Sequence, residues 1–310
     1  MNPETLPLYP LPVAERSLTL WLIGDGKPGH ENQSLGLAEA MQRHAACDIY
    51  RISIAGKGGI VGRIRAVFAQ SSGLPKPDFI IAAGHATHLA LLCLARKHQA
   101  KSIVLMRPSL PLRCFDLCIA PHHDFPKKPT RKNLILTRGA INRVHARDSP
   151  KTGKLILIGG PSKTHGWDTG AILDMLAKVT EGGGWQLTDS RRTPQGFLEQ
   201  ARMRLKGLEI FSCQETSPDW LPNKLREADE VWVSEDSVSM IYEALSSGAR
   251  VGLLPVPRLK PDSRVLRGID ELVETGYLTP FSAWQRIGQL RPAPEALNEA
   301  GRCAEIVLGR

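Results

Sequence analysis

The sequence predicts an α/β protein of two doubly wound domains, each with its own parallel sheet. Apolar, strand-like runs alternate with segments of helical period along the chain, and 310 residues exceed the usual size of one domain. A polar stretch with Pro and Gly, RVHARDSPKTG at 143–153, separates two halves with this pattern. We therefore expect a domain over 1–142, a linker over 143–153, and a domain over 154–310 whose last helix packs back on the first domain.

In the first half, each expected strand ends in a polar loop. These strands cover residues 18–23, 49–54, 78–83, 102–106, 115–120 and 134–136. The loops include Gly24–His30, Gly84–His85, Arg107–Ser109 and Pro121–Asp124. Because parallel strands end at one edge of a sheet, and ligands bind there, we expect these loops to line a site.

The second half repeats the pattern, with strands expected over 155–158, 185–187, 208–211, 231–233 and 251–254. Polar loops follow at 159–163 and 188–192, and late helices are expected to begin near Ser263 and Glu295.

The stretch 231–255 reads as a strand, a polar turn, a helix and a second strand, which is a βαβ unit. Ser237 is the expected N-cap of the helix, and Gly248 its expected end. A helix start offers free N–H groups to an anion, and the hydroxyls of Ser237 and Ser239 add donors. Glu243, four residues after Ser239, suits ribose hydroxyls. The alternative is a capped helix with a solvated Glu243.

Charge and composition limit the function classes. Residues 1–150 hold 20 Lys/Arg against 10 Asp/Glu, and residues 151–310 hold 20 against 21. A basic first half suits an anionic acceptor or an anionic membrane surface, and a basic amphipathic helix is expected over 60–68. Aromatic side chains are not interleaved with basic ones, so no nucleic-acid partner is expected. The six cysteines are scattered, and we expect reduced thiols and no metal site.

The ends and apolar runs predict the location. No run of 18 apolar residues occurs, and residues 1–16 resemble neither a signal peptide nor a transit peptide. We expect a cytoplasmic protein that is peripheral on the inner membrane.

Gly24, Gly26 and Gly29 form a G-x-G-x-x-G pattern between a strand and a helix, which is the context of a dinucleotide site. The acidic residue that usually follows at the end of the second strand is missing, and Arg51 and Ser53 stand there. No Tyr-x-x-x-Lys occurs. An NAD(P)-linked sugar-nucleotide enzyme is therefore our weaker alternative.

Several motifs together resemble the mitochondrial-fission Elm-type family. They are GDGKPGHENQ at 24–33, GGPSK at 159–163, TDSRRTP at 188–194 and SEDSVSM at 234–240. The resemblance spans roughly residues 18–275. It extends, more distantly, to two-domain GT-B glycosyltransferases such as MurG and the Kdo transferases. In those proteins the first domain binds the acceptor and the second binds a nucleotide sugar, which implies two Rossmann-like domains facing across a cleft.

The resemblance implies roles for the motif residues. A catalytic base would come from the first domain, where histidine ordinarily titrates near neutral pH and a carboxylate needs burial. The donor's phosphates would meet glycine N–H groups, serine hydroxyls and the planar fork of Arg191 or Arg192. The candidates are, for catalysis, Asp25, His30 and Glu31; for the donor, Gly159, Gly160, Ser162, Ser190, Arg191, Ser237, Ser239 and Glu243; for the acceptor side, Gly26, Lys27, Gly29, His85 and Arg107.

Two further hypotheses follow. The first is a metal-independent glycosyltransferase that needs no cofactor and moves a sugar from a nucleotide to an anionic glycolipid or another cell-envelope precursor. The second is a non-catalytic GT-B-like adaptor at a membrane, which recruits a protein partner and needs no active site.

Overall fold

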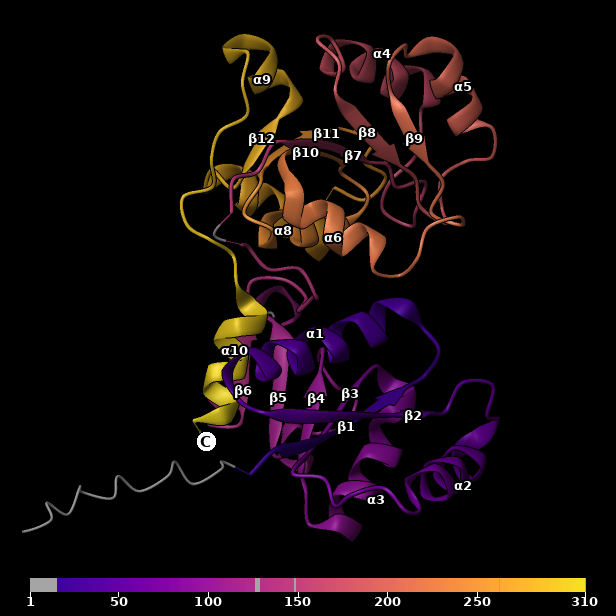
Figure 1. Ribbon diagram of the computed structural model, residues 1–310, viewed down its shortest axis with the longest axis vertical. Coiled ribbons are helices and arrows are strands. Elements are labelled where there is room, and N and C mark those ends of the chain that lie inside the picture. Colours follow the sequence, from indigo (N-terminus) through magenta and orange to yellow (C-terminus); the bar gives the residue numbers. More distant parts are fainter. Residues whose placement is uncertain (1–15, 126–128, 148, 262, 310) are drawn as a thin grey trace, which may run out of the picture.

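The computed structural model describes residues 16–125, 129–147, 149–261 and 263–309. Within them, two six-stranded parallel sheets form two separate lobes (Figure 1). Our expectation about a targeting segment falls on residues 1–16, nearly all of which lie outside the described residues. Among the helices that are described, none is both long and apolar enough to cross a membrane.

The first sheet has the strand order β2-β1-β3-β4-β5-β6, and every pairing is parallel. The chain runs from β1 outward to β2 and then returns to β3 on the other side of β1. The carboxyl ends of β1 and β3 therefore lie at a topological switch point, where ligands bind in open α/β sheets. The strands are β1 Leu18–Gly24, β2 Cys47–Ser53, β3 Phe79–Ala83, β4 Lys101–Leu105, β5 Leu117–Pro121 and β6 Leu134–Thr137.

The second sheet has the order β12-β11-β10-β7-β8-β9, which puts its own switch point between β7 and β10. The loops after these two strands are the 159–163 and 234–237 segments of the sequence motifs. The strands are β7 Gly153–Leu157, β8 Trp185–Thr188, β9 Glu209–Phe211, β10 Ala228–Ser234, β11 Arg250–Leu254 and β12 Leu278–Pro280.

Helices cover both faces of each sheet, which accounts for the continuous apolar character of the strands (Figure 1). The first sheet carries α1 Pro28–His44, α2 Gly59–Ser71, α3 His88–His98 and the short helices η1 His85–Thr87, η2 Leu112–Cys114 and η3 His122–Asp124. The second carries α4 Thr169–Val179, α5 Phe197–Arg204, α6 Trp220–Glu227, α7 Val238–Ser246, α8 Arg264–Glu274 and α9 Phe281–Ile287.

The last helix, α10 (Glu299–Leu308), returns to the first lobe. Its buried residues Ala300, Cys303, Ala304 and Val307 join the apolar cluster that α1 forms on the first sheet. It begins four residues after Glu295, where the sequence placed a helix start, because Asn298 accepts a hydrogen bond from the Gly301 N–H and caps it. The domain boundaries themselves stay a prediction.

Several element ends differ from the expectation, and two short elements were not expected. The fourth strand stops at Leu105, because Met106 has a positive φ of 68° and leaves the extended conformation. Gly153, placed in the linker, is the first residue of β7. The short β12 and α9 were not predicted, since a strand of three residues has no readable alternation.

The two lobes meet along α1, α7 and the segment after β6. Asn142 is buried and donates a hydrogen bond from Nδ2 to Ser246 Oγ of α7 (3.0 Å). The guanidinium of Arg143 pairs with Glu39 of α1 and with Asp219 before α6, each at 2.7 Å. These contacts hold α7 of the second lobe beside α1 of the first.

Gly36 lets α1 reach that junction. A Cβ at Gly36 would lie 2.5 Å from the carbonyl carbon and oxygen of Asn142, and a backbone cannot move aside cheaply. We expect Gly36→Ala to lower the free energy of unfolding by about 1–3 kcal/mol through overpacking. The control is Gly62→Ala in α2, where a Cβ meets nothing within 4 Å and alanine favours the helix. Urea denaturation compares them, and equal stability of the two variants would contradict this packing.

Candidate functional site

The loop after β1 holds an aspartate and a histidine as a pair. His30 Nδ1 lies 2.9 Å from Asp25 Oδ2. The Asp25 side chain is 4% exposed and that of His30 is 20% exposed, so the imidazole alone reaches solvent. A carboxylate on Nδ1 fixes the ring and leaves Nε2 to accept a proton, which is how a general base is oriented. No partner for Nε2 is found among the described residues.

Glu31 and three glycines shape this loop. Glu31 Oε1 accepts the Gly26 N–H at 3.0 Å, and a Cβ at Gly24 would lie 2.7 Å from the same oxygen. Gly84 has a φ of 87°, and a Cβ there would lie 2.3 Å from His30 Nδ1. The loop after β3 thus packs against the His30 ring. Glu31 holds the turn, which leaves His30 as the better placed base of the three candidates.

The acceptor-side candidates do not all gather here. Lys27 and Gly29 are exposed in the same loop, and Lys27 Nζ lies 3.9 Å from Asp25 Oδ2. His85 is exposed directly after Gly84. Arg107 points elsewhere, because its Nη1 donates to the Asp124 carbonyl at 2.7 Å.

In the second domain, the start of α7 offers unused donors. The N–H groups of residues 238–240 have no hydrogen-bond partner within the described residues, as expected for the first turn of a helix. Ser237 stands at the N-cap and is 8% exposed, yet its hydroxyl makes no capping bond. Ser239 is exposed one residue into the helix. The predicted anion site is therefore available at this helix start.

The glycine loop after β7 is engaged within the protein instead. The Gly159 N–H donates to Ser234 Oγ at 2.7 Å, and the Gly160 N–H donates to Asp236 Oδ2 at 2.8 Å. Arg192 Nη2 pairs with the same Oδ2 at 2.8 Å. The Asp236 side chain is fully buried, while the Arg192 side chain is 40% exposed, so the arginine shields the acid from the solvent side. The two glycines are needed for close packing, since a Cβ at Gly159 would lie 2.1 Å from Asp236 Oδ2.

Of the remaining candidates for binding the sugar donor, two serines are bonded within the protein and one arginine is open to a ligand. Ser162 Oγ accepts the N–H groups of Thr164 and His165, which closes a turn. Ser190 Oγ contacts Thr193 Oγ1 at 3.2 Å. Arg191 is exposed and pairs with no acid within the described ranges, so it is the arginine free to meet a ligand.

Glu243 joins the two halves of the site. It lies on the second turn of α7, and Asn32 Nδ2 of α1 donates to its Oε1 at 3.3 Å. Burial raises the pKa of Glu243 to about 7, against the lowering effect of the Asn32 hydrogen bond. Asn32 follows His30 by two residues, so the first turns of α1 and α7 face each other across the junction.

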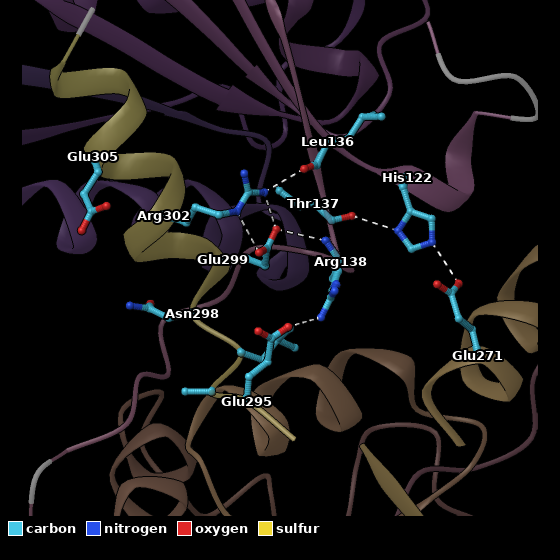
Figure 2. A pocket seen from close by; sticks show the side chains of 12 residues that line it. His122, Leu136, Thr137, Arg138, Glu271, Glu295, Asn298, Glu299, Arg302 and Glu305 are labelled. Carbon is cyan, nitrogen blue, oxygen red and sulfur yellow. Dashed lines mark hydrogen bonds and ion pairs between the residues drawn. The ribbon is translucent and has the colours of Figure 1, made fainter. Parts of the chain in front are cut away.

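A cavity of about 630 Å³ lies beside the junction, where the chain passes between the lobes (Figure 2). Its charged side chains already have partners, either across the two lobes or within α10. His122 Nε2 lies 3.1 Å from Glu271 Oε2, Arg138 pairs with Glu295, and Arg302 pairs with Glu299. We assign this cavity to the contact between the lobes and place the candidate site at the helix starts.

A family model described as mitochondrial fission ELM1 matches residues 28–310. The chain belongs to this family. The match includes the second lobe and the first lobe from α1 onward, so it contains His30 and the start of α7, while Asp25 lies just before it.

Two curated relatives have different names. The chain is 24% identical to an N-acetylglucosamine transferase of Rhodospirillum rubrum, named as acting on N-acetylmuramyl-(pentapeptide) pyrophosphoryl-undecaprenol, over 93% of this chain and 80% of that protein. It is 22% identical to the mitochondrial fission protein ELM1 of Arabidopsis thaliana, over 79% of this chain and 66% of that protein.

Solved structures share the fold. MurG of Acinetobacter baumannii aligns with a TM-score of 0.51 and 13% identity, covering 94% of this chain and 100% of that one. A UDP-GlcNAc 2-epimerase of Neisseria meningitidis, bound to UDP-GlcNAc, aligns with a TM-score of 0.52 and 11% identity, covering 94% and 98%. The protein therefore has the GT-B fold.

Sequence reasoning assigned no role to Asn32 or Asp236. Asn32 stands in the 24–33 motif without a role of its own, since no local pattern reveals a partner 211 positions away. Asp236 had a usable signal. A carboxylate directly before the N-cap of a helix expected to bind phosphate conflicts with that role, and such conflicts mark residues with a special function.

The buried carboxylate of Glu243 predicts a pH effect. Because its pKa is raised from 4.5 to about 7, the folded state holds the proton more tightly than the unfolded state. Stability from this group is full below pH 4.5 and is lost as the pH rises through 7. Glu243→Gln keeps an acceptor for Asn32 but cannot ionise. Its stability relative to wild type should rise by about 1–3 kcal/mol between pH 5 and 8.

Thermal unfolding at both pH values measures this, with the exposed Glu274→Gln as the control. A constant difference between Glu243→Gln and wild type across this range would show that the carboxylate is not buried at the junction.

Proposed function

We propose that this protein is a metal-independent glycosyltransferase that uses a nucleotide-sugar donor. The proposal rests on one observation, which is that a histidine–aspartate pair and a set of open hydrogen-bond donors both lie at the junction. The Asp25–His30 pair lies beside the first turn of α1, and the open donors lie at the first turn of α7. The Asn32–Glu243 hydrogen bond joins the two helices on the following turns.

The first domain would activate the acceptor. As the acceptor oxygen attacks the anomeric carbon, its proton passes to His30 Nε2, and Asp25 stabilises the imidazolium that forms. The pair acts without a metal, because a positioned base and an anion site are enough for sugar transfer.

The second domain would stabilise the leaving group. When the bond between the anomeric carbon and the phosphate oxygen breaks, the oxygen keeps the electron pair. The N–H groups of α7, the hydroxyls of Ser237 and Ser239, and the helix dipole stabilise that charge. Glu243 lies four residues after Ser239 and would turn from Asn32 to the ribose hydroxyls.

An anionic acceptor at the cytoplasmic membrane face fits the surface of the first domain. Residues 49–115 hold ten Lys/Arg against one Asp. Their net charge is therefore +9, as large as that of the whole chain. Ile60 and Val61 on α2 and Leu89 on α3 are exposed there, at 55%, 63% and 40%. A cavity of about 270 Å³ lined by Ile60, Leu89 and His85 adjoins Gly84, which touches His30. An anionic glycolipid would meet both features.

A second candidate function is a membrane adaptor without catalysis, in keeping with the fission-related name of the family. One observation favours it, namely that Asp236 occupies the Gly160 N–H and Arg192, which are donors that a phosphate would need. The NAD(P)-linked alternative is less favoured, because Glu31 occupies the Gly26 N–H where a pyrophosphate would bind.

Substitution of His30 separates enzyme from adaptor. His30→Ala should lower turnover by about 10²–10⁴, the usual share of a general base, while donor binding survives in the other domain. Asp25→Asn should also lower turnover, since it loses the carboxylate that stabilises the imidazolium. Complementation of a strain lacking the gene reports both without a known acceptor. The control is His44→Ala at the far end of α1. Full complementation by folded His30→Ala and Asp25→Asn proteins would favour the adaptor.

Two serines of the second domain test donor binding. The double variant Ser237→Ala, Ser239→Ala should lose nucleotide affinity, because each hydrogen bond to a charged group contributes about 1.5–3 kcal/mol. Its stability should hold, since neither hydroxyl caps a helix. Ser263→Ala is the matched control. It should lower stability and leave nucleotide affinity unchanged, because Ser263 Oγ caps α8 by accepting the Leu266 N–H at 3.3 Å. Isothermal titration with nucleotides measures the effect, and unchanged affinity of the double variant would reject the site.

A further inference from the structure

Asp236 puts a carboxylate where the second domain offers donors to an anion. Its Oδ2 accepts the Gly160 N–H and a guanidinium N–H of Arg192, both at 2.8 Å, and its side chain is fully buried. A main-chain N–H beside a guanidinium is a donor set that suits a phosphate oxygen. The donors that could bind one phosphate at the glycine loop are therefore occupied by the Asp236 carboxylate.

This carboxylate is held in place from several sides. The Nη1 of Arg192 donates to the carbonyls of Gly160 (2.6 Å) and Pro161 (3.2 Å), so the guanidinium clamps the glycine loop as well as Asp236. A Cβ at Gly159 would lie 2.1 Å from Asp236 Oδ2, and one at Gly160 would lie 1.9 Å from the Arg192 carbonyl oxygen. A ligand phosphate that took over these donors would leave Asp236 buried and unpaired, which strongly disfavours the exchange.

The neighbouring anion position is open. It consists of the first N–H groups of α7 and the hydroxyl of Ser237, which is more than nine-tenths buried and has no capping bond. Asp236 directly precedes Ser237 in the chain, so the open and the filled positions are adjacent. A second phosphate beside the first would therefore lie against the Asp236 carboxylate, where low dielectric strengthens the repulsion.

We infer that the donor site accepts a ligand with a single phosphate, that is, a sugar linked to a nucleoside monophosphate, and that Asp236 excludes a second phosphate. The inference rests on the proposed function, because it describes the same donor site. The Oδ1 of Asp236 is buried and has no partner among the described residues, so no second cation pairs with this carboxylate.

Binding of nucleotide pairs to the wild-type protein tests the inference without any mutation. Isothermal titration compares UMP with UDP, CMP with CDP, GMP with GDP, and orthophosphate with pyrophosphate. We expect the monophosphate of the best-bound pair to bind at least as tightly as its diphosphate. A diphosphate that binds more than about tenfold tighter than its monophosphate would overturn the inference while leaving the proposed function in place. Failure of every nucleotide to bind would overturn both.

The variant Asp236→Asn gives the second arm, since it removes the charge and keeps the shape. Diphosphate affinity should rise by about tenfold or more, with monophosphate affinity changed much less. The control is Asp189→Asn in the loop after β8, whose Oδ1 accepts the Cys213 N–H at 2.6 Å and not a glycine N–H of the loop after β7. Equal gains or losses for both classes of nucleotide in folded Asp236→Asn would refute a selective role. If Asp236→Asn does not fold, the wild-type comparison decides alone.

Discussion

The geometry of the candidate site depends on how Asn142 joins the two lobes. This buried amide donates to Ser246 of α7, and its Oδ1 accepts the Val144 N–H at 2.9 Å. If this amide were removed, the Ser246 hydroxyl and the Val144 N–H would lose their partner in a site shielded from water, and an unpaired buried polar group is costly in free energy. Gly36 brings α1 against the backbone of the same residue. Asn142 therefore joins the middle of α1 to the last turn of α7, and the Asn32–Glu243 hydrogen bond joins the same two helices nearer their N-terminal turns.

The charges at the junction follow a consistent arrangement. Two carboxylates near the site have a basic partner, since Asp25 is bonded to a histidine and Asp236 to an arginine. Glu235 repeats the second arrangement, because it pairs with Arg258, which also binds Asp270. The open cations and N–H groups lie at α7 and at Arg191. An anion is thus attracted to one narrow position and repelled from the loop beside it.

The sequence predicted the fold better than the site, for a physical reason. Alternation of apolar runs and helical periods is local, and it located the strands from Leu18 to Leu254 within a few residues. The loop Gly24–His30 and the turn at Ser237 were predictable because they follow strands. The state of each side chain was not, because Asn32, Asp236 and Arg192 have partners 32 to 211 positions away. Glycines illustrate the difference, since Gly159 and Gly160 looked free to approach a ligand and are needed for packing against Asp236 and Arg192.

The glycosyltransferase and adaptor hypotheses use the same basic surface and differ only in the role that they give to the candidate site. The basic segment 49–115 and the exposed Ile60 and Val61 lie on the first domain, outside the contacts of α1 with α7. Attraction to an anionic membrane would therefore survive any change at His30 or Asp236, since separated sites contribute independently. A role in fission, which the family's name suggests, is compatible with a glycosyltransferase fold. Membrane attachment would be the common property, and the protonation chemistry of His30 and the donors at α7 would decide whether a member also transfers a sugar.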